Sequence, residues 1–539
     1  MASFTPAVDS KTAQETRKQA DAVISRGVDT TTLRDDPEAK AAFLATFTAE
    51  EEKKIMRKVD QHFFLLIGLM FLIKTVDFTN AANVKVLQVG QESNILKELH
   101  MTPNQYNWVQ SIYYIAYIIF ETPSNLMLKW IGPHRWQSRI FLTWGIVLAC
   151  HAAVKNRASL LALRFLLGMM EAGLFPGVIC QLTSWYRTEE MGNPTSFSQA
   201  VQGTASIVGS LLAYGISYMN GKGGMSAWRW VFLLEGLFTI VFSGFVWYFL
   251  PDYPKSPRSD KWLTKREQEF IETRLTENTP LTSDPLFSKK EVIAALKAPT
   301  TWSFGFSHLF VNMGGYSLTW YLPTILTDLG FAKLPKNQLL NIPPAAGSII
   351  GVLLAAFLLR QALMPRPALL MINFVGMVVC FVLFFTIDSR GGLYAACILG
   401  QFFYQGSFMP FWAWRSITLK GSTGAALSLA IQNSMGQVGG VVGPQLFQSK
   451  WAYNRYKTSF AIAASGIIAA VFTNLLSWWL TKDLEMDVLR IAKLKRKARK
   501  EGTVFAADDV KVFDQRKYDS VVRLKSKNAH GEAVLAPTV

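Results

Sequence analysis

The chain has 539 residues, 50% of them hydrophobic and 17% charged, with a formal net charge of +17. This composition is too apolar for a soluble multidomain protein and predicts a polytopic membrane protein. Nucleic acid is excluded as the reason for the positive charge, because the Lys and Arg residues lie in tails and loops of an apolar chain, where cytosolic loops are usually basic.

Residues 1–59 are polar and charged, so we expect a cytosolic tail without a cleaved signal peptide. The four cysteines lie inside apolar segments without CxxC spacing, which predicts reduced thiols rather than disulfides or metal ligands. We find no Ser-His-Asp, HExxH or phosphate-loop pattern, and therefore expect no enzyme, no catalytic residue, no metal and no cofactor.

The first long apolar run, Phe63 to Val84, carries Lys74 and Asp77 in its interior. At ~1.5 Å per residue Lys74 lies roughly 16 Å along this helix, near the middle of a bilayer core of about 30 Å. Asp77 shares a helix face with it, followed by Asn80. A charge at that depth costs at least ~2.5 kcal/mol and needs partners. Either the pair only locks helix packing or, as we favour, it forms a substrate and proton path.

Eleven further apolar runs follow, and one polar interruption divides the twelve into six and six. We therefore predict an all-α membrane protein with 12 transmembrane helices in two six-helix halves. The predicted divisions are a tail at 1–59, an N-terminal bundle at 60–250, a charged linker at 251–300, a C-terminal bundle at 301–481 and a basic tail at 482–539. The predicted spans after the first are Trp108 to Leu128, Ile140 to Ala153, Leu160 to Tyr186, Ser196 to Met219, Trp230 to Leu250, Trp302 to Asp328, Leu339 to Leu359, Ala368 to Ile387, Leu393 to Trp414, Ala425 to Phe447 and Ser459 to Leu480.

An even number of spans puts both termini on one side of the membrane. Cytosolic tails and a cytosolic linker place most of the 55 Lys and Arg residues inside, although the short loops alone show no such bias. The lysines beside the first and last spans, among them Lys58 and Lys482, therefore decide the predicted orientation.

Local strings resemble a known family. Two six-span halves joined by a charged loop are typical of the major facilitator superfamily. IAYIIFETPSNLMLKWIGPHRW, LRFLLGMMEAGLFPGV, FLPDYP, YLPTIL and SMGQVGGVVGPQLF resemble its fungal anion:cation symporter family, of the allantoate permease type. The resemblance runs from about Lys58 to Asp483. It implies the major facilitator fold and proton-coupled transport of a carboxylate such as nicotinate, pantothenate, biotin or allantoate.

The chain departs from the family in two motifs. Many members carry Asp-Arg-x-Asn in the first span, whereas here Phe78 follows Asp77 and Lys74 lies one turn earlier, as in the pantothenate and biotin branch. In the signature after the second span Lys129 stands where an Asp is usual, while Gly132 and Arg135 remain.

For the first span we predict that Lys74 and Asn80 bind the substrate and that Asp77 carries the proton. A carboxylate in a low-dielectric cavity needs a cation. Lys74 supplies the charge, Asp77 keeps it protonated, and a proton on Asp77 frees it for the substrate.

Arg164, Gly168 and Glu171 match the family's RxxxG motif in the fourth span, which implies proton movement or an anchor for the cavity. We take Arg164 and Glu171 as proton-coupling residues, while snorkelling of Arg164 to the outer interface stays open. Glu121 and Glu235 lie near the predicted membrane edges, where we expect structural pairs.

In the second half, His308, Asn312 and Tyr316 share one face of the seventh span. We predict that Asn312 and Tyr316 bind substrate and that His308 makes an interhelical bond. Tyr404 and Asn433, polar groups in apolar runs, complete the predicted substrate site.

These observations predict a secondary transporter that takes up a small organic anion with protons, acting as a monomer in the lipid bilayer of the plasma membrane. An exporter of a small metabolite is the alternative within the same class. A nutrient sensor that does not transport is the alternative from another class.

Overall fold

The computed structural model describes residues 43–44, 46–186, 192–275, 289–330, 333–419, 422–501, 526–527 and 533–534. Its helices begin where the sequence supplies caps. Thr48 and Glu51 form a capping box at the start of α4, Thr102 and Gln105 form one at α6, and Thr264 opens α12 in the same way.

The first half contains α4 (Ala49–Val86), α5 (Ile95–Glu98), α6 (Pro103–Ile131), α7 (Pro133–Cys150), α8 (Arg157–Glu171), α9 (Leu174–Thr183), α10 (Gly192–Ser217) and α11 (Ala227–Phe249). Two short helices, α12 (Lys265–Thr273) and α13 (Lys289–Lys297), lie between the halves in sequence. Short 3-10 turns η1 (His151–Ala153), η2 (Lys222–Gly224) and η3 (Ser259–Lys261) complete this part.

The second half contains α14 (Pro299–Asp328), α15 (Ile342–Gln361), α16 (Arg366–Thr386), α17 (Arg390–Ile417), α18 (Ser422–Val442) and α19 (Lys457–Glu501), with turns η4 (Lys336–Asn341), η5 (Gly443–Leu446) and η6 (Ser449–Asn454). Helix α19 continues well past the predicted last span without a break. Outside the bundle, β1 (Ser526–Lys527) and β2 (Ala533–Val534) form a short antiparallel pair.

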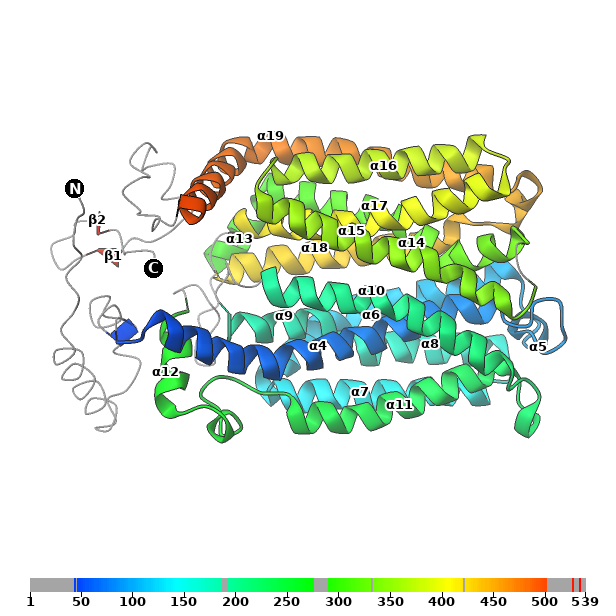
Figure 1. The fold of residues 1–539 in the computed structure, drawn as a ribbon. Helices are drawn as coiled ribbons and strands as arrows, with labels where there is room; N and C mark the ends of the chain where they lie inside the picture. The colour runs from blue at the N-terminus through cyan, green and yellow to red at the C-terminus, as the bar shows by residue number, and fades with distance from the viewer. Residues whose placement is uncertain are drawn as a thin grey trace.

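The two halves lie side by side along their length (Figure 1) and repeat one packing order. In the first half α4 packs on α10, α6 on α8, and α7 on α11. In the second half α14 packs on α18, α15 on α17, and α16 on α19. The halves meet where α6 contacts α18 and α10 contacts α15. The two six-helix halves therefore have the same internal packing and share one interface.

The predicted fourth span is two helices. Helix α8 ends at Glu171 and α9 begins at Leu174, because Gly173 takes a left-handed conformation with φ 89°. A Cβ atom at Gly173 would lie 2.2 Å from Ser124 Oγ, so α6 approaches too closely for any larger residue. The span predicted at Leu160 to Tyr186 therefore contains a break between two helices.

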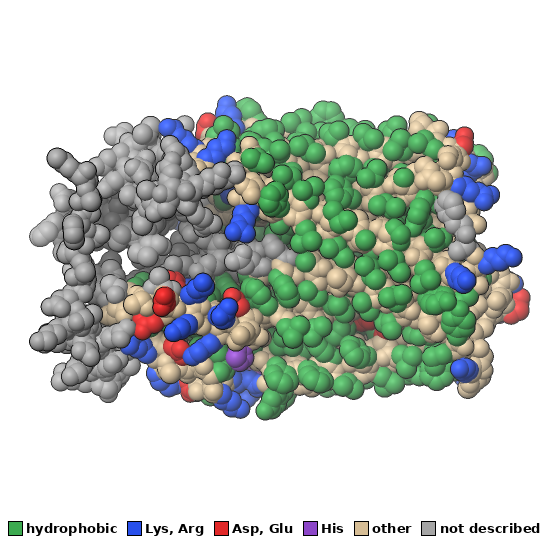
Figure 2. Space-filling view, in the orientation of Figure 1, with side chains coloured by type: hydrophobic (Ala, Val, Ile, Leu, Met, Phe, Trp, Pro, Cys, Tyr) green, Lys and Arg blue, Asp and Glu red, His purple; other side chains and the backbone are tan. Residues whose placement is uncertain are grey.

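The outer surface of the bundle is apolar. Figure 2 shows hydrophobic side chains covering the bundle, with charged residues gathered toward its two ends. Phe238, Val241 and Phe245 of α11 are exposed at helical spacing, as expected of a face turned to lipid. Six described helical stretches are long and apolar enough to cross a membrane: Glu50–Val86, Arg157–Thr183, Ala227–Phe249, Lys336–Gln361, Arg366–Thr386 and Lys457–Arg490.

The bundle has two ends, which we call the α5 end and the α12 end after the short helices there (Figure 1). At the α5 end the halves are joined by hydrogen bonds. Asn107 of α6 donates to the Phe447 carbonyl at 3.0 Å, and Ser111 donates to the Val441 carbonyl at 2.7 Å. The Lys85 ammonium lies 4.2 Å from the ring centroid of Tyr321. The α5 end is therefore closed.

At the α12 end the linker packs on the first half. Lys58 of α4 pairs with Glu267 of α12 at 2.7 Å, and Phe47 packs on Phe270 with ring centroids 4.4 Å apart. Burial by itself raises the pKa of Glu267, but the hydrogen bond from Lys58 and those at Thr264 bring it below the ordinary value. Helix α12 is thus fixed to α4.

Candidate functional site

The centre of the first half holds a cluster of buried charges, and α4 supplies its first cation. The Lys74 ammonium lies 3.5 Å from Glu171 Oε1 and 5.4 Å from the ring centroid of Tyr117. The Lys74 side chain keeps 20% exposure, whereas Glu171 keeps 4%. Asp77 makes no ion pair with Lys74, so the predicted pairing is wrong.

Asp77 belongs to a second group of charges. Its carboxylate interacts with Arg164 of α8 and with Glu235 of α11. Asn80, one turn along α4, donates a short hydrogen bond to Glu235 Oε1 and accepts one from Asn83 at 2.9 Å. The amide of Asn80 is therefore used within the protein.

Arg164 lies inside the bundle. It is 3% exposed, and its guanidinium lies 5.0 Å from the ring centroid of Phe232. The Nε and Nη2 atoms are buried and donate no hydrogen bond to described residues. Snorkelling is thereby excluded, and Arg164 serves as the cation facing Asp77 and Glu235. Glu235 is buried in this group and forms the structural pair expected of it, with Asn80 as its partner.

The helix break after α8 positions Glu171. Glu171 is the last residue of α8, and Gly173 turns the chain before α9 begins. Gly168, one turn earlier, lets α8 approach α6, since a Cβ atom there would lie 2.2 Å from the Tyr113 carbonyl oxygen. The Tyr113 side chain also interacts with the Glu171 carboxylate. Interrupted helices of this kind commonly mark carrier sites.

The second half contributes uncharged polar groups. Asn312 of α14 donates to the Gly436 carbonyl at 3.2 Å and accepts from the Tyr404 hydroxyl at 3.2 Å. His308 Nδ1 lies 3.0 Å from the Gln432 carbonyl oxygen, the interhelical bond predicted for it.

Aromatic side chains connect these groups across the two halves. The ring of Tyr316 lies 5.2 Å from Tyr114 of α6, 6.0 Å from Phe78 of α4 and 6.4 Å from Tyr404 of α17, measured between centroids. Tyr316 therefore contacts α4 one turn after Lys74, and Tyr404 lies behind Tyr316.

Asn433 joins the halves. Its amide donates to Glu121 Oε1 of α6 at 2.5 Å, and both side chains are buried. Glu121 also interacts electrostatically with Lys74. Glu121 therefore forms the structural pair expected of it, with a residue of the other half as its partner. The sequence analysis did not include Glu121 and Glu235 in the site. The signal that points to them is the buried charge of Lys74 and Arg164, because buried cations require acidic partners.

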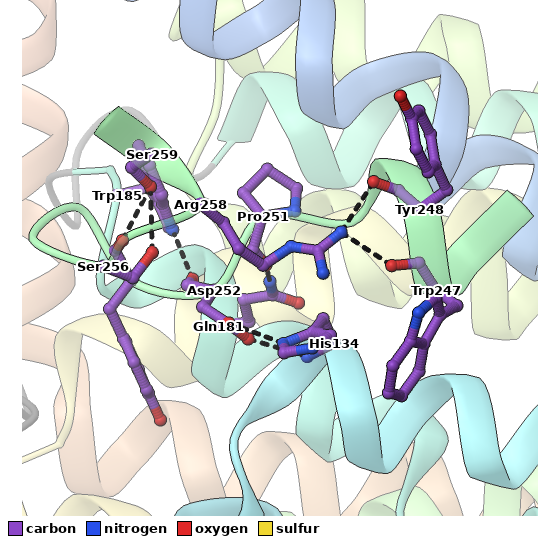
Figure 3. Close-up of polar contacts among 11 residues, drawn as sticks. His134, Gln181, Trp185, Trp247, Tyr248, Pro251, Asp252, Ser256, Arg258 and Ser259 are labelled. Carbon is purple, nitrogen blue, oxygen red and sulfur yellow. Dashed lines mark hydrogen bonds and ion pairs between the residues drawn. The ribbon is translucent and has the colours of Figure 1, made fainter. Parts of the chain in front are cut away.

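The loop after α11 contacts the start of α7 near the α12 end. Asp252, in the loop after α11, accepts the backbone N–H of His134 at 2.9 Å, and its other oxygen lies 2.5 Å from His134 Nδ1 (Figure 3). Arg258 from the same loop donates to the last carbonyls of α11, of Trp247 and Tyr248, at 2.6 Å each. The loop thus caps α7 and α11 together.

Within the described ranges no group of three or more His, Cys, Asp or Glu side chains is arranged to hold a metal ion. The site instead combines cations, carboxylates, amides and tyrosine hydroxyls. Such groups bind and release protons and small charged molecules.

Comparisons with known proteins agree with this fold. The model of the Major Facilitator Superfamily matches residues 75–444. The MFS transporter prlL of a fungal species (strain NRRL 50135) is 33% identical over 310 residues, which is 58% of this chain and 62% of that protein. The MFS-type transporter cnsO of Penicillium expansum is 27% identical over 483 residues, covering 87% of this chain and 91% of that protein.

A solved structure supports the same architecture. The crystal structure of a bacterial homologue of the human lysosomal transporter Spinster, inward-facing and unoccupied, matches with a TM-score of 0.54 at 13% identity. The match covers 79% of this chain and 98% of that one. With its repeated halves, its apolar surface and these relatives, the chain belongs to the Major Facilitator Superfamily and is a multi-pass membrane transporter.

Proposed function

We propose that this transporter takes up a small organic anion together with protons, with Lys74 as the cation that binds the substrate carboxylate. The observation that carries the proposal is the position of Lys74. It is partly exposed, it lies beside the interface of the two halves, and its ion-pair partner Glu171 is buried at a helix break.

The coupling we propose is a competition for Lys74. An ionised Glu171 holds the Lys74 ammonium, and a substrate carboxylate displaces it only when Glu171 takes up a proton. Asp77, with Arg164 and Glu235 beside it, is a second proton site. This places the first exchange at Glu171, whereas the sequence alone suggested Asp77.

The remaining substrate contacts come from the second half in this proposal. Tyr316 and Tyr404 lie across the interface from α4 and offer rings and hydroxyls to an organic anion. Asn312 and Asn433 hold neighbouring groups in place through their own hydrogen bonds. Asn80 acts on Glu235, and so supports the proton site and does not contact substrate directly.

For the membrane arrangement we propose twelve transmembrane helices with both termini and the α12 end in the cytosol. The repeated packing order supports six helices in each half, with α8 and α9 together forming one span. Lys58, Lys255 and Arg274 gather on the α12 side, which supports a cytosolic position. The plasma membrane and a monomeric state complete the proposal.

Uptake by whole cells tests the proposed function. Radiolabelled pantothenate, nicotinate, biotin and allantoate are offered at pH 5 and pH 7 to cells that lack their own carriers and express wild type or Lys74→Gln. We expect acid-stimulated uptake of one compound by wild type. For Lys74→Gln we expect uptake to fall by roughly 100-fold, because a substrate carboxylate that loses its buried charged partner binds about 3 kcal/mol more weakly.

The matched control is Lys97→Gln, which removes a cation at the surface, where Lys97 pairs with the exposed Glu92. It should transport like wild type. Uptake that Lys74→Gln leaves intact would refute the substrate role of Lys74. Faster loss of a preloaded compound from wild-type cells, without uptake, would support an exporter. No movement of any compound in either direction would support the sensor.

A further inference from the structure

We propose that Glu121 is an additional proton-coupling residue, and that its hydrogen bond to Asn433 is a gate which holds the two halves together on the α12 side of the site. The inference rests on the proposed function, because it gives that transport cycle a further proton site and a closing contact.

The position of this hydrogen bond in the bundle supports its role as a gate. It joins α6 to α18, with Glu121 3% exposed and Asn433 6% exposed. Within the described ranges, the hydrogen bonds between the halves that involve other first-half residues lie nearer the α5 end, from Asn83 to Ser111 and at Tyr114, which bonds to Tyr316. Glu121 lies roughly 15 Å beyond Ser111 along α6. The bond to Asn433 is therefore the inter-half hydrogen bond nearest the α12 end in the part of the chain that the structure describes.

One carboxylate oxygen of Glu121 is available to a proton. Oε1 accepts from Asn433, whereas Oε2 is buried and accepts no hydrogen bond within the described residues. The groups that face this carboxyl are the Lys74 ammonium from α4, the Tyr117 hydroxyl from α6 and Ser434 from α18. Ser434 is close enough to stabilise the charged carboxylate, and a proton at Oε2 replaces that interaction without breaking the bond from Asn433 to Oε1.

A proton on Glu121 changes two interactions of its carboxylate. An ionised Glu121 accepts a charge-assisted hydrogen bond from Asn433, roughly twice as strong as a neutral one. It also attracts Lys74 in competition with the substrate. A proton on Oε2 weakens both interactions at once, since the carboxyl becomes neutral. One protonation thus loosens the contact between the halves and releases Lys74 for the substrate.

This behaviour fits a transport cycle in one direction. Opening the α12 side requires α6 and α18 to separate at Glu121, which a protonated Glu121 allows. After the proton leaves, the ionised carboxylate binds Asn433 again and supports closure of that side. The empty carrier then returns with its α12 side closed.

A distance measurement without substrate tests the gate. Spin labels are attached to Arg135→Cys, at the exposed start of α7, and Leu363→Cys, in the exposed turn between α15 and α16, in a chain without its native cysteines. Both positions lie at the α12 end, one in each half. Distances are measured in nanodiscs at pH 5 and pH 8 for wild type, Glu121→Gln, Asn433→Ala and the control Asn474→Ala, which removes another buried amide.

We expect the wild-type distance to lengthen at pH 5, and Glu121→Gln and Asn433→Ala to show the longer distance at both pH values. Asn474→Ala should follow wild type. A Glu121→Gln variant that keeps the wild-type response to pH, an Asn433→Ala variant that stays short at pH 8, or a wild type that does not respond would each overturn the proposal. Should Glu121→Gln fail to fold, Asn433→Ala still decides whether the bond closes the gate. If wild type showed no acid-stimulated uptake, that result would contradict only the proposed function, because the distances are measured without substrate.

Discussion

Glu98 illustrates how a single carboxylate outside the membrane fastens the first half. It accepts hydrogen bonds from Ser226 at 2.5 Å, from Trp228 at 2.7 Å and from Arg229 at 2.6 Å, so α5 is tied to the start of α11. Burial by itself raises the pKa of Glu98, but these hydrogen bonds and the Arg229 charge bring it below the ordinary glutamate value.

A lowered pKa in the folded state makes stability depend on pH. The Glu98 carboxylate contributes its full stabilisation of the folded state above its unfolded pKa of about 4.3. This stabilisation is lost as the pH falls through the lower pKa of the folded state. We expect Glu98→Gln to lower the free energy of unfolding by about 2 kcal/mol at pH 7, since hydrogen bonds to charged groups contribute about 1.5–3 kcal/mol. The deficit should shrink below about pH 4. Thermal unfolding in detergent over this pH range measures it.

Glu92→Gln is the control, because Glu92 is an exposed residue of the same loop that pairs with Lys97. It should leave the unfolding temperature nearly unchanged. If Glu98→Gln lowered the free energy of unfolding by the same amount at every pH down to about 3, the pH dependence could not be assigned to Glu98.

At the residue scale the sequence predicted the buried charges of the first span, since Lys74 and Asp77 interrupt an apolar run. It did not predict their partners. Glu121 and Glu235 were assigned to membrane edges because the limits of the apolar runs were taken as the limits of the spans. In the structure α6 extends to Ile131, which places Glu121 well inside the bundle. Pairing also depends on side-chain direction, which sequence spacing does not determine.

At the scale of single elements, the contact between α6 and α8 depends on Gly168. A methyl group there would lie 2.2 Å from a backbone oxygen of Tyr113, so the helices must separate. We expect Gly168→Ala to destabilise the protein by about 1–3 kcal/mol, as overpacking does, and to weaken uptake because Arg164 and Glu171 move with α8. Unfolding temperature and uptake, measured on the same preparation, test this expectation.

Gly215→Ala in α10 provides the matched control. A Cβ atom at Gly215 meets nothing within 4 Å, and the residue is helical. Alanine should therefore raise stability slightly, by roughly 0.5–1 kcal/mol. Equal effects of the two substitutions would mean that close packing at Gly168 is not the cause.

The helices themselves were largely predictable, whereas the break between α8 and α9 was not. Apolar runs and capping residues indicate the helices, and α12 and α13 both lie inside the charged linker predicted at 251–300. The run from Leu160 to Tyr186 stays apolar through Gly173, so hydrophobicity gives no sign of the interruption. The break follows from the contact of Gly173 with Ser124, a residue of another helix.

At the scale of the whole molecule, the closed α5 end predicts that transport requires separation of the halves there. The side-chain oxygen Oδ1 of Asn104 accepts hydrogen bonds from the backbone N–H of Ser449 at 2.8 Å and from the Ser449 hydroxyl at 2.9 Å. We expect a short, cleavable bifunctional thiol reagent to bridge Asn104→Cys and Ser449→Cys. The bridge should stop uptake almost completely, because an end that cannot open admits no substrate.

Radiolabelled uptake before and after cleavage of the bridge measures this effect, and the two single-cysteine variants serve as controls. Full activity in the bridged protein would show that the α5 end does not open during transport. The division into two halves was predictable from the twelve apolar runs. The closure was not, since Asn104 and Ser449 are far apart in sequence and belong to different halves.

The charges of the site are unequally shared, and this has an electrical consequence. Four carboxyl groups, those of Asp77, Glu121, Glu171 and Glu235, face two cations, Lys74 and Arg164, and all six belong to the first half. If the transporter couples protons to an anion as proposed, a carrier that has released both holds an excess of negative charge. In a cell with a negative interior, the membrane voltage drives such a charge outward with about 2.3 kcal/mol per elementary charge for each 100 mV. The voltage would then act on the return of the empty carrier, and the resting potential would help to set how fast each cycle is completed.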